Sequence, residues 1–135
     1  MKYLLLPLFC IIFQLHVFSQ KNYTFIREAD LTGKQQAAWY SFDTTWKKHI
    51  FPGCLLENHL KLSCAHCDNI YIDVKLKIDS TGKLVSYEKT GGEMCGQEVT
   101  DKLVKCFLDF FYFLEFPPEL RNVILEVKLG SSLKC

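Results

Sequence analysis

The sequence lacks an excess of charge of either sign. Its 135 residues include 16 lysines and arginines and 15 aspartates and glutamates, and no basic run occurs along the chain. A nucleic-acid-binding protein normally carries a basic patch or stripe, so the composition argues against that class. Proline and glycine are scarce, with four and seven residues, which excludes a proline-rich or glycine-rich spacer. The length fits one small domain.

The motifs of common enzyme classes are missing as well. The chain has no glycine-rich phosphate loop, no Gly-x-Ser-x-Gly turn and no His-Glu-x-x-His pair. His49, His59 and His66 have no Ser or Asp partner at a recognisable catalytic spacing. We therefore predict that the protein is not an enzyme, and we assign no catalytic residue, cofactor or metal ligand.

The chain begins with an apolar segment of the secretory type. Lys2 supplies a positive start, residues 3–18 are apolar apart from Gln14 and His16, and Ser19 ends a cleavage-site pattern. The apolar run falls short of the ~20 residues that a bilayer span needs. We predict a signal peptide over residues 1–19, no stable membrane anchor, and a periplasmic or secreted location.

Cysteine, by contrast, is abundant, with seven residues in the chain. Cys10 belongs to the leader, which leaves an even set: Cys54, Cys64, Cys67, Cys95, Cys106 and Cys135. In an exported chain such a set predicts disulfide bonds, although the sequence does not choose among the possible pairings.

The spacing of four residues leaves an alternative open. Cys54, His59, Cys64 and Cys67 offer three sulfurs and one imidazole, which is a legitimate tetrahedral zinc set. Cys64 and Cys67 also have the spacing of a thiol-redox pair, but the segment that follows reads as a strand and not as the helix that would lower a thiolate pKa. The alternative is a small periplasmic or secreted metal-binding or thiol-redox protein.

Two segments have the apolar spacing of helices. Thr32 and Gln35 have the spacing of a capping box. The stripe that follows ends at Pro52 and Gly53 and consists of Trp39, Phe42, Trp46 and Ile50. The second stripe begins near Gln97, ends before Pro117 and Pro118, and consists of Val99, Leu103, Phe107, Phe110 and Leu114.

Three segments have the pattern of strands. Residues 70–78 alternate strictly between apolar and polar side chains, and residues 84–89 return after a turn over residues 79–82. Residues 123–129 alternate again. We assign residues 20–33 to a lead segment without a period, residues 34–130 to the domain, and residues 131–135 to a tail.

These elements predict an α+β domain with the order helix, strand, strand, helix, strand. The hairpin pairs the first two strands, and the second helix is long enough for a crossover. A right-handed crossover places the last strand beside the first. The predicted sheet has three strands in the order 2-1-3, antiparallel or mixed, with both helices on one face.

Two sequence features carry a resemblance to a known family. The alternating strand over residues 72–78 leads into Asp79-Ser80-Thr81-Gly82-Lys83, and Phe116-Pro117-Pro118-Glu119 precedes the last strand. Over residues 34–130 this pattern resembles the C-terminal domain of the TonB family of bacterial energy transducers. The leader, which ends in Phe-Ser-Gln, is similar to leaders of exported Bacteroidetes proteins.

The resemblance implies a binding function. Members of the family pair an edge strand with an extended peptide, the mode called β-augmentation. In the predicted strand order residues 123–129 form an edge, with Ile124, Glu126 and Lys128 on the face away from the helices. We therefore predict a partner-binding site at these three residues. The expected partner is a protein or an extended peptide segment, such as an envelope or outer-membrane protein, or a second copy of the chain, and not a nucleic acid.

Overall fold

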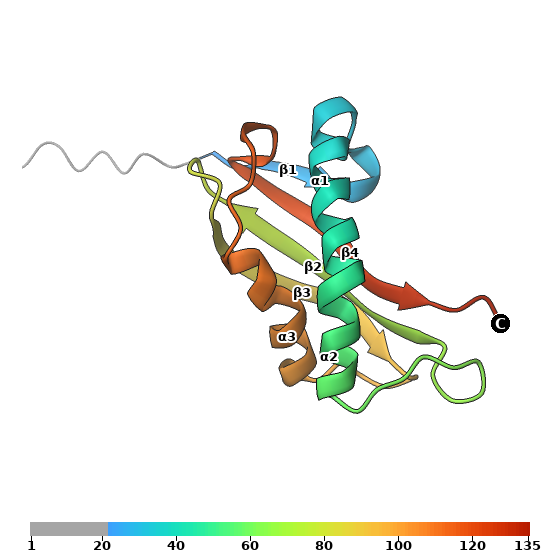
Figure 1. The fold of residues 1–135 in the computed structure, drawn as a ribbon. Coiled ribbons are helices and arrows are strands. Elements are labelled where there is room, and N and C mark those ends of the chain that lie inside the picture. The colour runs from blue at the N-terminus through green and yellow to red at the C-terminus, as the bar shows by residue number, and fades with distance from the viewer. Residues whose placement is uncertain (1–21) are drawn as a thin grey trace, which may run out of the picture.

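A computed structural model of the chain describes residues 22–135, which fold as a sheet with helices packed across it (Figure 1). The predicted signal peptide and its cleavage site lie outside the described residues. Within residues 22–135, no helix is long and apolar enough to cross a membrane.

The sheet has four strands, one more than predicted. The predicted three are β2 (Asn69–Ile78), β3 (Leu84–Met94) and β4 (Val123–Ser132), and β2 runs antiparallel between the other two. Their relative order is the predicted one. A further strand, β1 (Thr24–Arg27), pairs in parallel with β4, so the sheet is mixed and has the order β1-β4-β2-β3. The prediction of a three-stranded sheet is therefore wrong.

The additional strand comes from the lead segment, where the sequence shows no period. Thr24, Phe25 and Arg27 are exposed and only Ile26 is half-buried. A short edge strand is held chiefly by its backbone hydrogen bonds, which leave no trace in the hydrophobic pattern. The pairing starts where the Thr24 N–H donates to the Asn122 carbonyl at 2.9 Å.

The Asp79 carboxylate stabilises the turn between β2 and β3. Asp79 Oδ1 accepts hydrogen bonds from the backbone N–H groups of Thr81 at 2.8 Å and Lys83 at 3.0 Å. Gly82 adopts a φ of +82°, and a Cβ there would lie 2.3 Å from the Phe116 carbonyl oxygen. This position therefore requires glycine, and the turn packs directly against the segment before β4.

The first helical segment is longer than predicted. α1 (Gly33–Thr45) begins after Thr32 as expected, but the Thr32 side chain makes no capping hydrogen bond with the described residues. A π-helical turn over Trp46–Ile50 then joins α1 to α2 (Phe51–Glu57).

The predicted helix end at Pro52 and Gly53 is therefore wrong. Proline lacks an N–H and its ring clashes with the carbonyl four residues earlier in a regular α-helix. The π-helical turn ends at Ile50, and Pro52 lies in the first turn of α2, where a missing N–H is tolerated and the chain continues as a helix. The extension carries Cys54 to a buried position.

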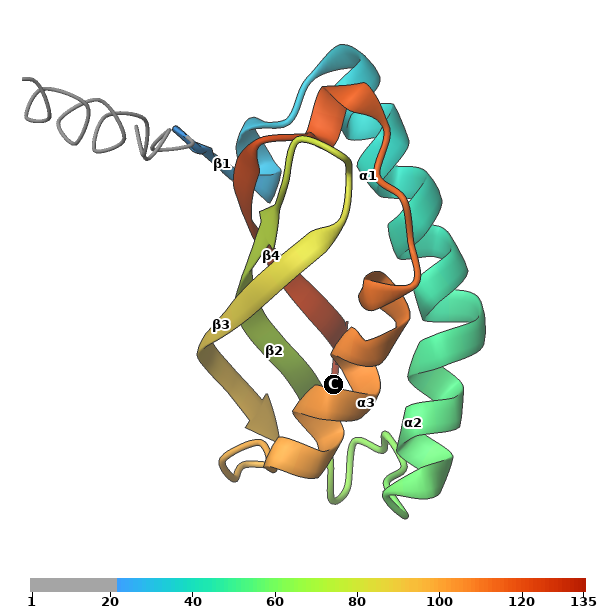
Figure 2. The same ribbon diagram turned by 90° about the vertical axis from the view of Figure 1, so that its left-hand side faces the viewer.

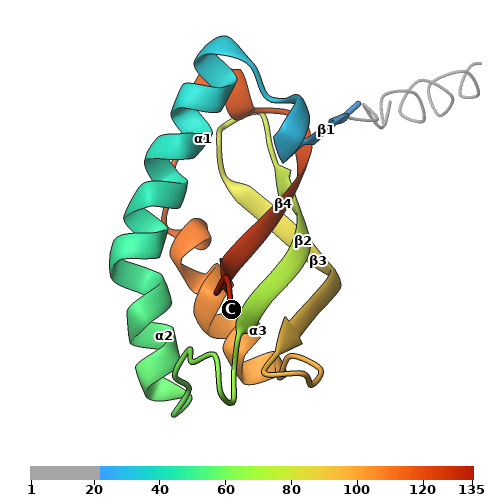
Figure 3. The same ribbon diagram turned by 90° about the vertical axis from the view of Figure 1, so that its right-hand side faces the viewer.

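The second helix, α3 (Asp101–Tyr112), confirms the predicted stripe. Thr100 takes the N-cap position, and its Oγ accepts a hydrogen bond from the Leu103 N–H at 3.3 Å. Figures 2 and 3 show α1, α2 and α3 on one face of the sheet, as predicted, and the other face open. The core lies between these two layers.

Aromatic residues of both helices fill this core. Trp46 is fully buried, its Nε1–H donates to the Phe107 carbonyl at 2.9 Å, and the two rings meet edge to face with centroids 5.0 Å apart. The strands contribute alternate side chains that are fully buried, namely Ile70, Ile72, Val74, Leu76, Ile78, Leu125 and Leu129. The predicted inward faces of β2 and β4 are thus confirmed.

Candidate functional site

The strand predicted to form a binding edge, residues 123–129, does not lie at an edge. β1 covers its outer side in a parallel register that runs from Thr24 opposite Val123 to Arg27 opposite Glu126. The prediction of a free edge at this strand is therefore wrong, because the lead segment supplies a strand that the sequence pattern does not reveal.

Glu28 continues this cover beyond the end of β1. Its Oε2 accepts a hydrogen bond from the backbone N–H of Lys128 at 3.1 Å, and its Oε1 accepts one from Trp39 Nε1–H at 3.0 Å. The carboxylate thus takes the place of a further strand residue beside β4 and ties that strand to α1.

The three predicted contact residues lie on the open face of the sheet. Ile124 is next to Phe25 in the β1–β4 register, and the Lys128 Nζ lies 4.1 Å from the centroid of the Tyr71 ring. Glu126 is half-buried between β1 and β2. Their side chains therefore point where the sequence predicts, but the backbone beside Ile124 and Glu126 is already paired. Their role in partner binding stays a prediction.

The sheet has two edge strands, the four-residue β1 and β3, and β3 is the long one. It is 11 residues long, and its outer side has no strand partner among residues 22–135. Val85 and Tyr87 of this strand are 49% and 37% exposed. A long edge strand with unpaired N–H and C=O groups is a template for the addition of another strand.

The ladder determines which groups of β3 point outward. The Lys128 N–H points away from β2, because it donates to Glu28. In an antiparallel pair, opposed residues direct their backbone groups either toward each other or both away from each other. Asp73 lies opposite Lys128, so its N–H and C=O groups point to β3, and so do those of Lys75 two residues later. Glu88 lies opposite Lys75, so its N–H and C=O groups point to β2. Those of Tyr87 and Lys89, one residue to either side, therefore point to the free side.

A hollow of about 240 Å³ lies on the open face beside this edge. It is lined by Phe25, Lys75, Lys77, Ser86, Tyr87, Glu88 and Ile124. Lys75 Nζ lies 5.6 Å from the Phe25 ring centroid, and Lys77 Nζ lies 4.6 Å from that of Tyr23. Lysine side chains therefore lie over aromatic rings on the open face beside this edge.

All six cysteines that follow the predicted leader are paired, which confirms the prediction of disulfides. The bonds are Cys54–Cys106, Cys64–Cys135 and Cys67–Cys95. The last one fixes the connection before β2 to the residue that follows β3. Disulfides of this density are typical of exported proteins.

The alternative metal or redox site is not formed. The three sulfurs of the proposed zinc set, from Cys54, Cys64 and Cys67, belong to three different disulfides. Cys64 and Cys67 are not bonded to each other, as a thiol-redox pair requires. His59 is exposed with a φ of +54°, and across residues 22–135 no group of three His, Cys, Asp or Glu side chains is arranged to hold a metal ion.

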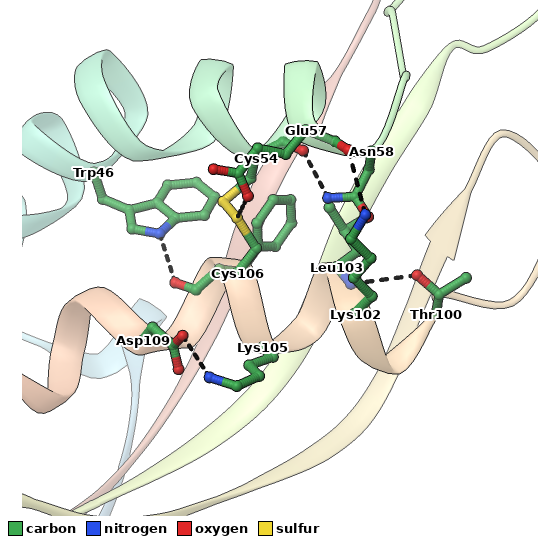
Figure 4. The surroundings of a disulfide bond; sticks show 11 residues. Trp46, Cys54, Glu57, Asn58, Thr100, Lys102, Leu103, Lys105, Cys106 and Asp109 are labelled. Atoms are coloured by element: carbon green, nitrogen blue, oxygen red, sulfur yellow. Dashed lines mark hydrogen bonds and ion pairs between the residues drawn. A yellow bond between two sulfur atoms is a disulfide. The ribbon is translucent and has the colours of Figure 1, made fainter.

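The Cys54–Cys106 disulfide joins α2 to α3 (Figure 4). A groove of about 580 Å³ lies beside it. Glu57 Oε2 lies 3.5 Å from Cys106 Sγ, a contact and not a hydrogen bond, because a disulfide sulfur carries no hydrogen. Lys102 Nζ donates to the Glu57 carbonyl at 3.4 Å, and Lys105 donates to Asp109 at 2.6 Å, an ion pair that raises the pKa of Lys105. The disulfide and the Lys102 bond join α2 to α3, whereas the Lys105–Asp109 pair lies within α3.

Comparison of the chain with family models, with curated proteins and with solved structures gave no match. The assignment of a site therefore depends on the geometry described above.

Proposed function

We propose that this chain is an exported protein-binding domain that adds an extended peptide segment to the free edge of β3. The observation that carries the proposal is the contrast between the two ends of the sheet. β1 and Glu28 cover β4, whereas Tyr87 and Lys89 direct backbone groups to the free side of an 11-residue strand. Pairing of a peptide with such a strand gives affinity through backbone bonds and specificity through alternate side chains.

The sequence resemblance adds to this proposal. The order of helices and strands over residues 34–130 and the turn at Asp79–Lys83 resemble the TonB C-terminal domain, whose members bind extended peptides by edge-strand pairing. We propose that the chain is related to that family and has the same mode of binding, with the site at β3 in place of the predicted Ile124, Glu126 and Lys128.

The proposal is tested by a proline at an outward position of β3. Peptides that bind the mature protein are selected from a library of linear sequences, and their affinities are measured for wild type, Lys89→Ala and Lys89→Pro. Lys89→Ala keeps the outward N–H, so binding should stay within about twofold, while Lys89→Pro should weaken it at least about tenfold by removing a donor and blocking close approach.

Circular dichroism and a count of free thiols establish that the proline variant is folded and keeps its disulfides. A folded Lys89→Pro protein that binds the selected peptides as tightly as wild type does would rule out β3 as the binding edge. The same holds if the peptides perturb the amide resonances of α2 and α3 and leave those of β3 unchanged.

A further inference from the structure

The free edge of β3 is bordered by different side chains on the two faces of the sheet. On the helix side, Tyr87 lies opposite Leu76 in the register, and its ring meets Tyr112 of α3 edge to face with centroids 6.3 Å apart. Tyr112 is 42% exposed, and partial burial together with Tyr87 and Asp109 raises the pKa of its hydroxyl. The adjoining Phe113 is 86% exposed. This border is aromatic.

On the open side, the border is acidic. Glu88 lies opposite Lys75 and Glu93 lies opposite Tyr71. Lys75 is directed over the Phe25 ring, and in the described part of the chain neither carboxylate takes part in an ion pair. Two carboxylates without a cationic partner thus lie along one side of an edge that has no neighbouring strand.

We propose that the segment that pairs with β3 alternates apolar and basic residues. The inference rests on the proposed function and specifies its partner. Because side chains of a strand alternate between the two faces, every second residue of the segment lies on the helix side, where Tyr87 and Tyr112 offer an apolar contact. The residues between them lie on the open side, where lysine or arginine pairs with Glu88 before the register shift that follows Lys89.

Two synthetic peptides with blocked ends test the charge preference directly. In one, valine alternates with lysine, and in the other valine alternates with glutamate; both are titrated into the disulfide-bonded protein at low salt. The edge carboxylates attract the lysines of the first peptide and repel the glutamates of the second, so the lysine peptide should bind about tenfold more tightly. The difference should shrink as salt is added, since exposed charges are screened.

Substitutions on the protein assign the preference to the edge. Glu88→Lys should abolish or reverse the difference between the two peptides. Asp30 forms an exposed ion pair with Arg27 of β1, at the other edge of the sheet. Asp30→Lys makes the same change of charge there and should leave the difference unchanged. Tyr112 belongs to α3 and takes no part in strand pairing. Tyr112→Ala should weaken the binding of both peptides about fivefold by removing the apolar contact.

The outcomes separate the partner chemistry from the proposed function. If Lys89→Pro abolishes binding of both peptides but Glu88→Lys leaves their ratio unchanged, β3 is the binding edge and the alternating basic partner is wrong. If neither peptide binds wild type, or Lys89→Pro binds both normally, the edge-pairing function itself fails. Sedimentation of wild type as a dimer that Lys89→Pro dissociates would assign the edge to a second copy of the chain and overturn the proposed partner.

Discussion

The two strands that flank β2 differ in what covers their outer backbone groups. On one side, β1 and then the Glu28 carboxylate cover the outer groups of β4 from Val123 to Lys128. On the other side, β3 is longer than β1 and no strand covers it within residues 22–135. Natural proteins usually protect edges, and β3 has charged side chains and a register shift opposite Asp73 and Val74 but no covering strand among the described residues, so an edge of this length points to a use.

The comparison also shows that coverage need not depend on hydrophobic side chains. β1 buries little, and its hold on β4 comes from backbone pairing and from one carboxylate with two hydrogen-bond donors. β3 instead has its end fixed covalently, because Cys95 follows it directly and bonds to Cys67. The outer side of β4 is covered through hydrogen bonds, whereas β3 is anchored near Cys95, where the Met94 N–H donates to the Gln97 carbonyl at 2.8 Å, and has no strand partner before that point in the described chain.

Among the changes made at the strands that flank β2, removing the anchor of β3 should have the largest effect on stability. Cys67 and Cys95 are 28 positions apart, and closing a loop of this length restricts the unfolded chain by about 3.5 kcal/mol. The double variant Cys67→Ala and Cys95→Ala should lose about that much free energy of unfolding, measured by urea denaturation. The matched pair Cys64→Ala and Cys135→Ala removes the bond to the tail that follows β4.

These two double variants should differ in where the structure loosens. Hydrogen exchange at the β3 amides should accelerate more when Cys67 and Cys95 are replaced than when Cys64 and Cys135 are. Equal acceleration in both would show that the Cys67–Cys95 bond does not anchor this edge.

A proline in β4 should lower the free energy of unfolding nearly as much as loss of the Cys67–Cys95 disulfide does. Glu126 is paired with Arg27 of β1 and Lys75 of β2, and its N–H points toward β1 by alternation from Lys128. Glu126→Pro removes this donor and drives its ring against β1, so it should lower the free energy of unfolding by about 3 kcal/mol. A loss below about 1 kcal/mol would mean that β1 does not cover this strand in solution.

Glu28 should contribute less, but in a way that identifies its role. Glu28→Ala leaves the Trp39 and Lys128 donors without their charged acceptor and should cost about 2 kcal/mol in urea unfolding. Asp30→Ala removes only the exposed pair with Arg27 and should cost less than about 0.5 kcal/mol. Equal costs for the two variants would argue against Glu28 as the cover of β4.

The smallest effect should come from a proline at the free edge. Lys89→Pro removes an outward N–H and one exposed ion pair with Glu98, so stability should fall by less than about 1 kcal/mol. The neighbouring Glu88→Pro removes an inward donor to β2 and should cost at least about 2 kcal/mol. The reverse order would show that the register of β3 is shifted by one residue.

The sequence predicted the parts of the fold that depend on side-chain burial. The alternation of residues 70–78 gave the central strand, and the spacing of Leu103 and Phe107 gave α3. The order of the three predicted strands followed from the crossover rule. Each of these signals comes from residues that bury one face, and burial is what hydrophobic periodicity records.

The features that the sequence did not predict depend on backbone hydrogen bonds and on the positions of helices and strands in the folded chain. β1 is fixed by pairing with β4, the helix continues past Pro52 because that residue lies in the first turn of α2, and the disulfide partners depend on where helices and strands end. The prediction of a free edge at residues 123–129 is wrong for the first of these reasons. Ile124 and its neighbours were placed at an edge because nothing in residues 20–33 indicated a strand.

The most direct test of a free β3 edge is amide hydrogen exchange at Tyr87 and Lys89, followed by NMR in the free protein and with a bound peptide. In the free protein these two amides should exchange at least about a hundredfold faster than those of Ser86, Glu88 and Lys128, which point to β2 or to Glu28. A bound segment should slow Tyr87 and Lys89 and leave Lys128 unchanged. Tyr87 and Lys89 amides that are already protected in the free protein, or that stay fast with the peptide bound, would contradict the account.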